Sequence, residues 1–219
     1  MMKIIFATAN KGKLREAAEV LGPDYEVVSP ADLGITEDIP ETGATLQENS
    51  LQKARYLYEK TGLPCFADDT GLEVDALGGA PGIYSARYAG SGHDSQANMD
   101  KLLAELDDRG KCPPDPLGRC APTASREGTA ETISRRARFH TVVTLILADG
   151  QEHFFEGVCE GSIAHEKHGA GGFGYDPIFL ADDYPGRSLA EVSEAEKNAV
   201  SHRGKALRAM AAWLKALRA

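Results

Sequence analysis

The chain has 219 residues, of which 42% are hydrophobic and 26% are charged, as is usual for a soluble globular protein with a real core. Its net charge of −9 argues against binding to duplex nucleic acid or to an anionic membrane surface. No apolar stretch approaches the roughly 20 residues of a membrane span, and Lys3 followed by a strand-like run is unlike a signal peptide. The four cysteines form no CxxC pair, so we expect a reduced protein of the cytoplasm.

Strand and helix patterns alternate in the first half of the chain. Residues 29–43 are polar and irregular, and the glycine- and proline-containing residues 72–90 indicate a hairpin followed by a loop. Gly62 is the expected C-terminal stop of a helix. We expect strands over residues 3–8, 25–29 and 63–68, and helices over residues 11–21, 45–61 and 98–108.

The second half begins with a break in this pattern. Residues 108–134 contain four prolines and almost no large apolar side chains, which predicts a long mobile surface loop. Residues 138–163 contain two β-branched and aromatic runs around Asp149 and Gly150, which predicts a hairpin and therefore a mixed sheet. A helix is expected over residues 198–218, with a core-packing stripe of Leu207, Met210, Trp213, Leu214 and Leu217.

The junction between the first strand and the first helix predicts an anion site. A strand that enters a helix through a short loop directs N–H groups and the positive end of the helix dipole at one point. Lys11 and Lys13 lie at that end, where the dipole disfavours cations, so we favour phosphate binding over a pair of solvated lysines. The segment ATANKGKL departs from a phosphate loop at Ala7 and Leu14, and Leu14 lacks the hydroxyl that would hold magnesium. Acidic residues elsewhere must therefore hold any metal.

Asp68 and Asp69 come at the end of an apolar strand, where ligand sites of α/β sheets lie. Because successive strand side chains point to opposite faces, one carboxylate is expected to face the site and the other to support the structure. Mg²⁺ commonly takes one or two carboxylates together with substrate phosphates, so two acids suffice. A turn-initiating Asp pair before Thr70 is an equally good interpretation.

Glu48 closes the sequence Thr45–Glu48, a T-x-x-E capping box, so the local pattern favours a structural role. Lys53 lies five residues further along the same helix, on a different face, and by itself indicates nothing.

The glycine cluster HGAGGFGYDP, residues 168–177, matches GxGxxG literally. A hairpin precedes it and Pro177 stands where a helix should open, so we reject a dinucleotide-binding fold. A loop that brings backbone close to a ligand, with Phe173 and Tyr175 as platforms for a base, is favoured over a simple bend between strands.

A basic cluster lies in SEAEKNAVSHRGKA, residues 193–206, in a short turn between helices. Ser193 and Glu196 form a second capping box. Arg and His donate to carbonyl or phosphate oxygens and Lys suits phosphate, although a solvated basic face is the alternative. The cluster consists of Lys197, His202 and Arg203.

Together these segments resemble the inosine/xanthosine triphosphate pyrophosphatases, which remove non-standard purine nucleotides. The resemblance covers nearly the whole chain and rests on TANKGK (8–13), ETGATLQENSLQKA (41–54), ADDTGLEVDALGGAPGIYSARYAG (67–90), GGFGYDPIF (171–179) and EKNAVSHRGKAL (196–207). It implies a single two-lobed α/β domain over residues 1–219, with a long twisted mixed sheet flanked by helices and a central cleft. It also implies a homodimer, Mg²⁺, and hydrolysis of ITP, dITP or XTP to the monophosphate and pyrophosphate.

The resemblance also assigns roles to individual residues. The triphosphate is expected to contact Thr8, Ala9, Asn10, Lys11, Gly12, Lys13 and Lys53. The expected metal ligands are Glu48 and Asp69. Asp69 is also the expected base for the attacking water, assisted by Asp68. Thr70 stands where the family more often has serine, and its hydroxyl is expected to contact the substrate. The expected base pocket consists of Phe173, Gly174, Tyr175, Asp176, Lys197, His202 and Arg203.

Discrimination between purines is expected at the six-position, where His202 and Arg203 can donate to an oxo group and adenine would present a donor to a donor. The segment 108–134 is longer than the family pattern leads us to expect. Cys112 and Cys120 within it could pair under oxidation, but reduced thiols are favoured in the cytoplasm. Two other functions remain open. One is a Maf-type pyrophosphatase for other modified nucleotides, and the other is a non-catalytic nucleotide-binding regulator.

Overall fold

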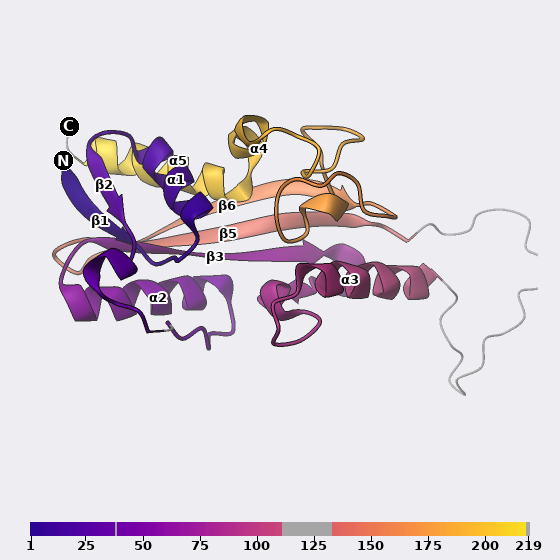
Figure 1. The fold of residues 1–219 in the computed structure, drawn as a ribbon, viewed down its shortest axis with the longest axis horizontal. Coiled ribbons are helices and arrows are strands. Elements are labelled where there is room, and N and C mark those ends of the chain that lie inside the picture. The colour runs from indigo at the N-terminus through magenta and orange to yellow at the C-terminus, as the bar shows by residue number, and fades with distance from the viewer. Residues whose placement is uncertain (38, 111–132, 218–219) are drawn as a thin grey trace, which may run out of the picture. The chain divides into compact units, whose positions relative to one another are not determined.

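The computed structural model describes residues 1–37, 39–110 and 133–217 and shows a mixed β-sheet flanked by helices (Figure 1). The strands are β1 (Met2–Phe6), β2 (Tyr25–Val28), β3 (Cys65–Val74), β4 (Pro81–Gly82), β5 (Arg136–Ile146), β6 (Glu152–Ile163) and β7 (Phe179–Ala181). The helices are α1 (Lys11–Leu21), α2 (Leu46–Thr61), α3 (Ser95–Gly110), α4 (Glu194–Val200) and α5 (His202–Ala216). The sheet order is β2-β1-β3-β5-β6-β7, with β4 paired to β3. Pairing is parallel for β1 with β2 and β3 and antiparallel for β3 with β4 and β6 with β7, so the predicted mixed sheet is confirmed.

The chain divides into two compact units. Unit 1 contains Met1–Gly71, Phe139–Cys159 and Ser193–Ala219, and unit 2 contains Leu72–Arg138 and Glu160–Val192. No helix in the described ranges is long and apolar enough to cross a membrane. Most of the loop predicted over residues 108–134, including both of its cysteines, lies outside the described residues.

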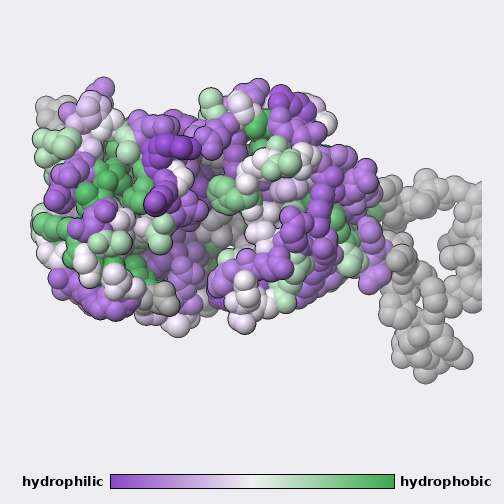
Figure 2. Space-filling view, viewed as in Figure 1, coloured by the Kyte–Doolittle hydropathy of each residue, from purple (hydrophilic) through white to green (hydrophobic). Residues whose placement is uncertain are grey.

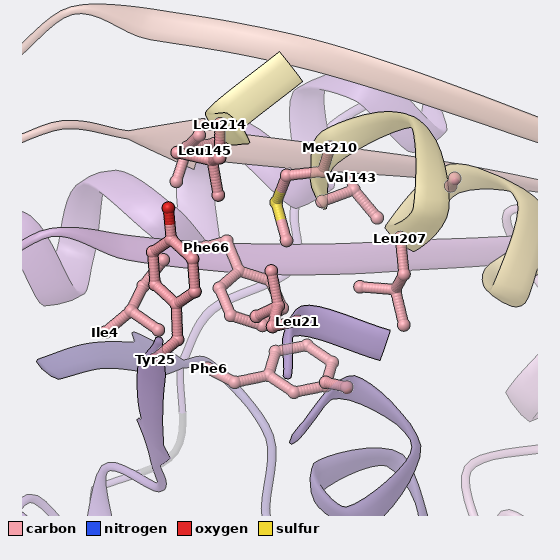
Figure 3. Packing of buried hydrophobic residues seen from close by; sticks show 12 residues of the cluster. Ile4, Phe6, Leu21, Tyr25, Phe66, Val143, Leu145, Leu207, Met210 and Leu214 are labelled. Carbon is pink, nitrogen blue, oxygen red and sulfur yellow. The ribbon is translucent and has the colours of Figure 1, made fainter. Parts of the chain in front are cut away.

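Alternation along the strands of unit 1 produces two apolar layers. Ile4, Phe6 and Phe66 point to one face, where the rings of Phe6 and Phe66 stack with centroids 4.3 Å apart in one apolar cluster with Leu21 of α1 and with Leu207, Met210 and Leu214 of α5 (Figure 3). The alternate residues Ile5 and Cys65 point to the other face, which α2 covers (Figure 1). Helices with one apolar face thus cover both sides of these strands, and Asp68 on β3 is buried at 2% exposure.

Surface hydrophobic residues of unit 1 gather over the region where α1, β2 and α5 meet (Figure 2). A groove of about 450 Å³ lies in this region. Its lining residues are Val20, Leu21, Asp24, Tyr25, Ala211, Ala212 and Lys215, none of which is a candidate site residue.

Unit 2 is organised around Ser85, which joins three segments of the chain. Its hydroxyl donates to the carbonyl of Gly82 at 2.6 Å and accepts from the N–H of Leu72 at 2.8 Å. Its carbonyl accepts from the Tyr175 hydroxyl at 2.8 Å and, more weakly, from the Asn98 amide at 3.4 Å. The glycine-rich loop is therefore tied to the turn that follows β4.

Three sequence expectations need correction. The strand predicted over residues 63–68 continues as β3 through Val74, because the expected hairpin starts only where β4 pairs with Leu72 and Glu73. The helix expected over residues 198–218 is interrupted at Ser201, as the turn expected within residues 193–206 requires. The extended backbone of Ser201 and its side-chain bond to the N–H of Gly204 start α5 anew. Leu217, placed in the core stripe, is 60% exposed because α5 ends one residue before it.

Candidate active site

The loop between β1 and α1 is held together by its own polar side chains. Asn10 caps α1, with its Oδ1 accepting from the N–H groups of Gly12 at 2.8 Å and Lys13 at 3.2 Å. Thr8 Oγ1 accepts from the N–H of Asn10 at 3.1 Å, while Lys11 is exposed. Two of the N–H groups predicted to face an anion are thus already paired with Asn10, which leaves cationic side chains as a main attraction for phosphate at this helix end.

A buried ion-pair cluster joins α1, β3 and α5. Both carboxylate oxygens of Asp68 accept from Lys13 Nζ at 3.0 Å, and Oδ2 also accepts from Arg203 Nε at 2.8 Å. Glu16 on α1 reaches Arg203 from its other side, at 3.6 Å. Burial alone would raise the pKa of Asp68, but Lys13, Arg203 and Lys53 hold it well below its usual value. Asp68 is therefore a permanent carboxylate that fixes two cations.

Asp69 has a different set of partners, supplied by α2 and the segment before it. Its Oδ1 accepts from Lys53 Nζ at 3.0 Å, and its Oδ2 accepts from the Asn49 amide at 3.2 Å. The same Lys53 ammonium donates to Glu41 at 2.7 Å. Burial raises the pKa of Asp69 in spite of Lys53, so its proton affinity is increased. This combination suits a general base.

The two aspartates confirm the predicted division between faces. Asp68 lies on the α1 and α5 side of β3, with Phe66, and Asp69 lies on the α2 side, with Cys65. Both lie within a regular strand, so the interpretation as a turn-initiating pair is wrong. The strand period of two places neighbouring carboxylates in different electrostatic environments.

Thr70 is also part of β3, and its hydroxyl shares a hydrogen bond of 2.6 Å with Thr141 on β5. Thr141 is fully buried. The hydroxyl predicted to serve the substrate is therefore positioned by a neighbouring strand.

Glu48 lies at the start of α2, as its sequence pattern predicts, but the capping box is only half formed. Thr45 Oγ1 accepts from the N–H of Glu48 at 3.1 Å. The Glu48 carboxylate accepts from the N–H of Ala44 at 2.6 Å, one residue before the cap, and the side chain is exposed. The hydrogen bonds of Asp69 come from other residues, and no group of three or more potential metal ligands occurs in the described part of the chain.

The basic cluster lies across the junction of α4 and α5, and the capping box of Ser193 and Glu196 that precedes it is formed. His202 and Arg203 are buried, so the alternative of a solvated basic face is wrong for both. The His202 ring stacks on Phe139 with centroids 4.7 Å apart, and burial, helped by Arg203, holds its pKa well below the usual value. His202 Nδ1 is buried with no hydrogen-bond partner within the described ranges, which marks it as a polar atom that a ligand could satisfy.

The glycine-rich loop belongs to unit 2 and is irregular, as predicted. Tyr175 is 5% exposed and is anchored to Ser85, and the buried Asp176 accepts from the N–H of Phe173 at 2.7 Å. Gly172 has φ +72°, and a Cβ there would lie 2.2 Å from Asp176 Oδ2. The loop therefore buries two of its predicted substrate residues to build its own shape, and it presents Phe173, 54% exposed, at the surface.

Sequence reasoning missed Glu16, Glu41 and Asn49. Glu16 contacts Arg203, Glu41 contacts Lys53 and Asn49 contacts Asp69. Because each partner lies in another element of the chain, no local sequence pattern predicts these contacts. Asn49 is only 1% exposed. The one sequence signal for its burial is its position four residues before Lys53, on the same helix face.

Comparison with known proteins agrees with the resemblance inferred from the sequence. The chain is 44% identical to a dITP/XTP pyrophosphatase of Christiangramia forsetii, covering 97% of this chain and 99% of that one, and 46% identical to one of Porphyromonas gingivalis, covering 94% of both. The solved structure of a HAM1 protein from Coxiella burnetii matches with a TM-score of 0.82 and 36% identity, covering 98% of this chain and 99% of that one. The model of the Ham1 family matches residues 4–114 and 123–213, and the chain therefore belongs to the Ham1 family.

Proposed function

We propose that this protein hydrolyses non-standard purine nucleoside triphosphates, namely dITP, XTP and ITP, to the monophosphate and pyrophosphate. The relatives named dITP/XTP pyrophosphatases support this substrate class. The observation that carries the proposal is Asp69, a carboxylate of raised pKa held between Lys53 and Asn49 next to a second, permanently charged aspartate. A base beside fixed cations is the arrangement that water attack on a phosphoanhydride requires.

The reaction divides between the two faces of β3. On the α2 side, Asp69 takes a proton from the attacking water, and Lys53 holds the carboxylate in place and stabilises negative charge. On the α1 side, Asp68 fixes Lys13 beside the N-terminal loop, where Lys13 and the exposed Lys11 attract the triphosphate. Thr70, positioned by Thr141, offers a hydroxyl to the substrate.

Magnesium is a further part of the proposal, and the donor set fits it. Carboxylate oxygens are the ligands Mg²⁺ prefers, and one or two suffice when phosphate oxygens complete the coordination. Asp69 and Glu41 share the Lys53 ammonium, so two carboxylates already converge on one cation. We propose Asp69 and Glu41 as ligands, with Glu48 as the competing candidate from the sequence. When bound, Mg²⁺ would neutralise phosphate charge and lower the pKa of a bound water.

Recognition of the base is proposed for two sets of residues. In unit 1, His202 is neutral and has an unsatisfied Nδ1, so one tautomer could donate to a six-oxo group. In unit 2, Phe173 is the exposed aromatic ring of the glycine-rich loop and is suited to stacking on a purine. A homodimer is also proposed, from the resemblance, and size-exclusion chromatography with light scattering tests it. A cytoplasmic location is proposed from the four cysteines, which form no CxxC pair, and fractionation of cells tests it.

The decisive experiment measures pyrophosphate release from dITP, XTP, ITP, GTP and modified pyrimidine triphosphates, each with and without Mg²⁺. We expect rapid turnover of the first three only, and only with the metal. Preference for modified pyrimidine nucleotides would favour a Maf-type enzyme instead. Binding of ITP without any turnover would favour a regulator.

A further inference from the structure

Asn49 connects the proposed base to the backbone of the segment that precedes α2. The residue is 1% exposed, and its amide makes two hydrogen bonds of opposite polarity. Its Oδ1 accepts from the N–H of Gly43 at 2.8 Å, and its Nδ2 donates to Asp69 Oδ2 at 3.2 Å. Because the N–H of Gly43 can only donate, the amide orientation is fixed and the NH₂ group must face Asp69.

The contact with Gly43 is tight enough to act as a rigid support. A Cβ at position 43 would lie 2.6 Å from the Glu48 Cβ and 2.9 Å from Asn49 Oδ1, so the backbone packs directly against the helix start. Two residues before Gly43 stands Glu41, which pairs with Lys53 at 2.7 Å. Asn49 therefore bonds to the segment that carries Glu41, and it also bonds directly to the carboxylate of Asp69.

Asp69 is consequently held at both oxygens by two residues of one helix. Lys53 occupies Oδ1 and Asn49 occupies Oδ2, and the two donors lie four positions apart on α2, on the same face. A carboxylate held by one donor alone can rotate about its terminal torsion, whereas two donors from one rigid element fix the plane of the group.

We propose that Asn49 is a positioning residue for catalysis, whose amide fixes the orientation of the Asp69 carboxylate relative to Lys53 and Glu41. This proposal rests on the proposed function for the role of Asp69. Misplacement of a reacting group by about 1 Å can cost on the order of 100-fold in rate. Loss of Asn49 is therefore expected to lower kcat more than it changes KM, since the triphosphate contacts of Lys11 and Lys13 come from α1.

Two substitutions at this position separate the two hydrogen bonds. Asn49→Asp has nearly the same shape and keeps an oxygen for the N–H of Gly43, but it cannot donate to Asp69 when ionised. Asn49→Leu removes both bonds, and Asn49→Ala replaces it if the leucine variant does not fold. Ser50→Ala is the matched control, because Ser50 is the next residue, is fully buried and bonds to Gln47 and Thr144.

The experiment measures kcat and KM for dITP, thermal unfolding, and hydrogen exchange of the Gly43 amide in the ligand-free protein. We expect both Asn49 variants to lose roughly 10- to 100-fold in kcat, with KM changed by less than about threefold. Ser50→Ala should keep kcat within about twofold of the wild-type value, even if its Tm falls as far as the Tm of the Asn49 variants. Hydrogen exchange of the Gly43 amide should accelerate in Asn49→Leu and stay slow in Asn49→Asp. A loss of kcat in both variants would then come from the missing bond to Asp69 and not from the missing bond to Gly43.

The positioning role of Asn49 and the proposed function can fail separately. Asn49 variants that keep kcat in proportion to their stability, as Ser50→Ala does, would overturn the positioning role while wild-type turnover upholds the proposed function. Absence of dITP turnover in the wild-type protein would overturn the proposed function and, with it, the catalytic meaning of the Asn49 contact.

Discussion

Asp68 and Asp69 are neighbours on β3, yet they bind different cations on opposite faces of the strand. Asp68 is neutralised by Lys13 and Arg203 from α1 and α5, and Asp69 by Lys53 from α2. The pKa of the first is lowered and that of the second is raised. One carboxylate is thereby a fixed anion, and its neighbour has the raised pKa that suits the proposed base, a difference that the two environments alone produce.

Substitution of each aspartate by asparagine should reveal this division. Asp69→Asn should reduce turnover by roughly 100-fold or more and leave Tm near that of the wild type, because Lys53 keeps Glu41 as a partner. Asp68→Asn should destabilise the fold by about 3–5 kcal/mol, because it leaves the buried Arg203 and the half-buried Lys13 without their shared carboxylate. Turnover and urea unfolding are measured for both variants. Near-normal activity of Asp69→Asn would exclude Asp69 as the base.

The two candidate metal carboxylates can be separated by their magnesium dependence. Glu41→Gln removes the carboxylate that converges with Asp69 on Lys53, so the Mg²⁺ concentration for half-maximal activity should rise at least about tenfold. Glu48→Gln keeps an oxygen for the N–H of Ala44 and should change this concentration less than about threefold. A reversed order of the two effects would restore Glu48 as the metal ligand.

The sequence predicts elements well where the signal is local. The strand β1 and helix α1, the Gly62 end of α2 and the hairpin at Asp149 and Gly150 all follow from neighbouring residues, and the structure confirms them. Gly62, for example, ends α2 with φ +61°, which glycine adopts without strain.

The site is less predictable because its contacts join distant parts of the chain. The partners of Asp68 lie 55 positions before it and 135 positions after it, and nothing in their local patterns links them. The extension of β3 beyond Asp68 escapes the local pattern for a related reason. The polar run that starts at Asp68 is typical of a turn, and the partners that keep it in the strand, such as Thr141 for Thr70 and Ser85 for Leu72, come from distant residues.

Acid should destabilise the protein through His202. Burial lowers its pKa in the folded state, Arg203, Lys197 and Lys13 lower it further, and Asp68 opposes them. The unfolded state then binds the proton more tightly, so stability is lost as the pH falls below the unfolded value near 6.5. Between pH 7.5 and 5.5 the wild type should lose about 1 kcal/mol more than His202→Gln, measured by urea unfolding. Equal losses in the two proteins would show that His202 protonates freely in the folded state.

The glycine-rich loop offers a test of how unit 2 shapes its exposed ring. Gly172 and Gly186 have similar backbone angles, φ +72° and +77°, but only at Gly172 would a Cβ collide, with Asp176. Both alanine variants should carry a similar backbone strain of about 1 kcal/mol, visible in Tm. Only Gly172→Ala displaces the carboxylate that holds the N–H of Phe173, so only it should raise KM for dITP, by about fivefold or more, because the ring proposed to stack on the purine moves. Equal KM values in the two variants would mean that the Asp176 contact does not set the position of Phe173 for the substrate.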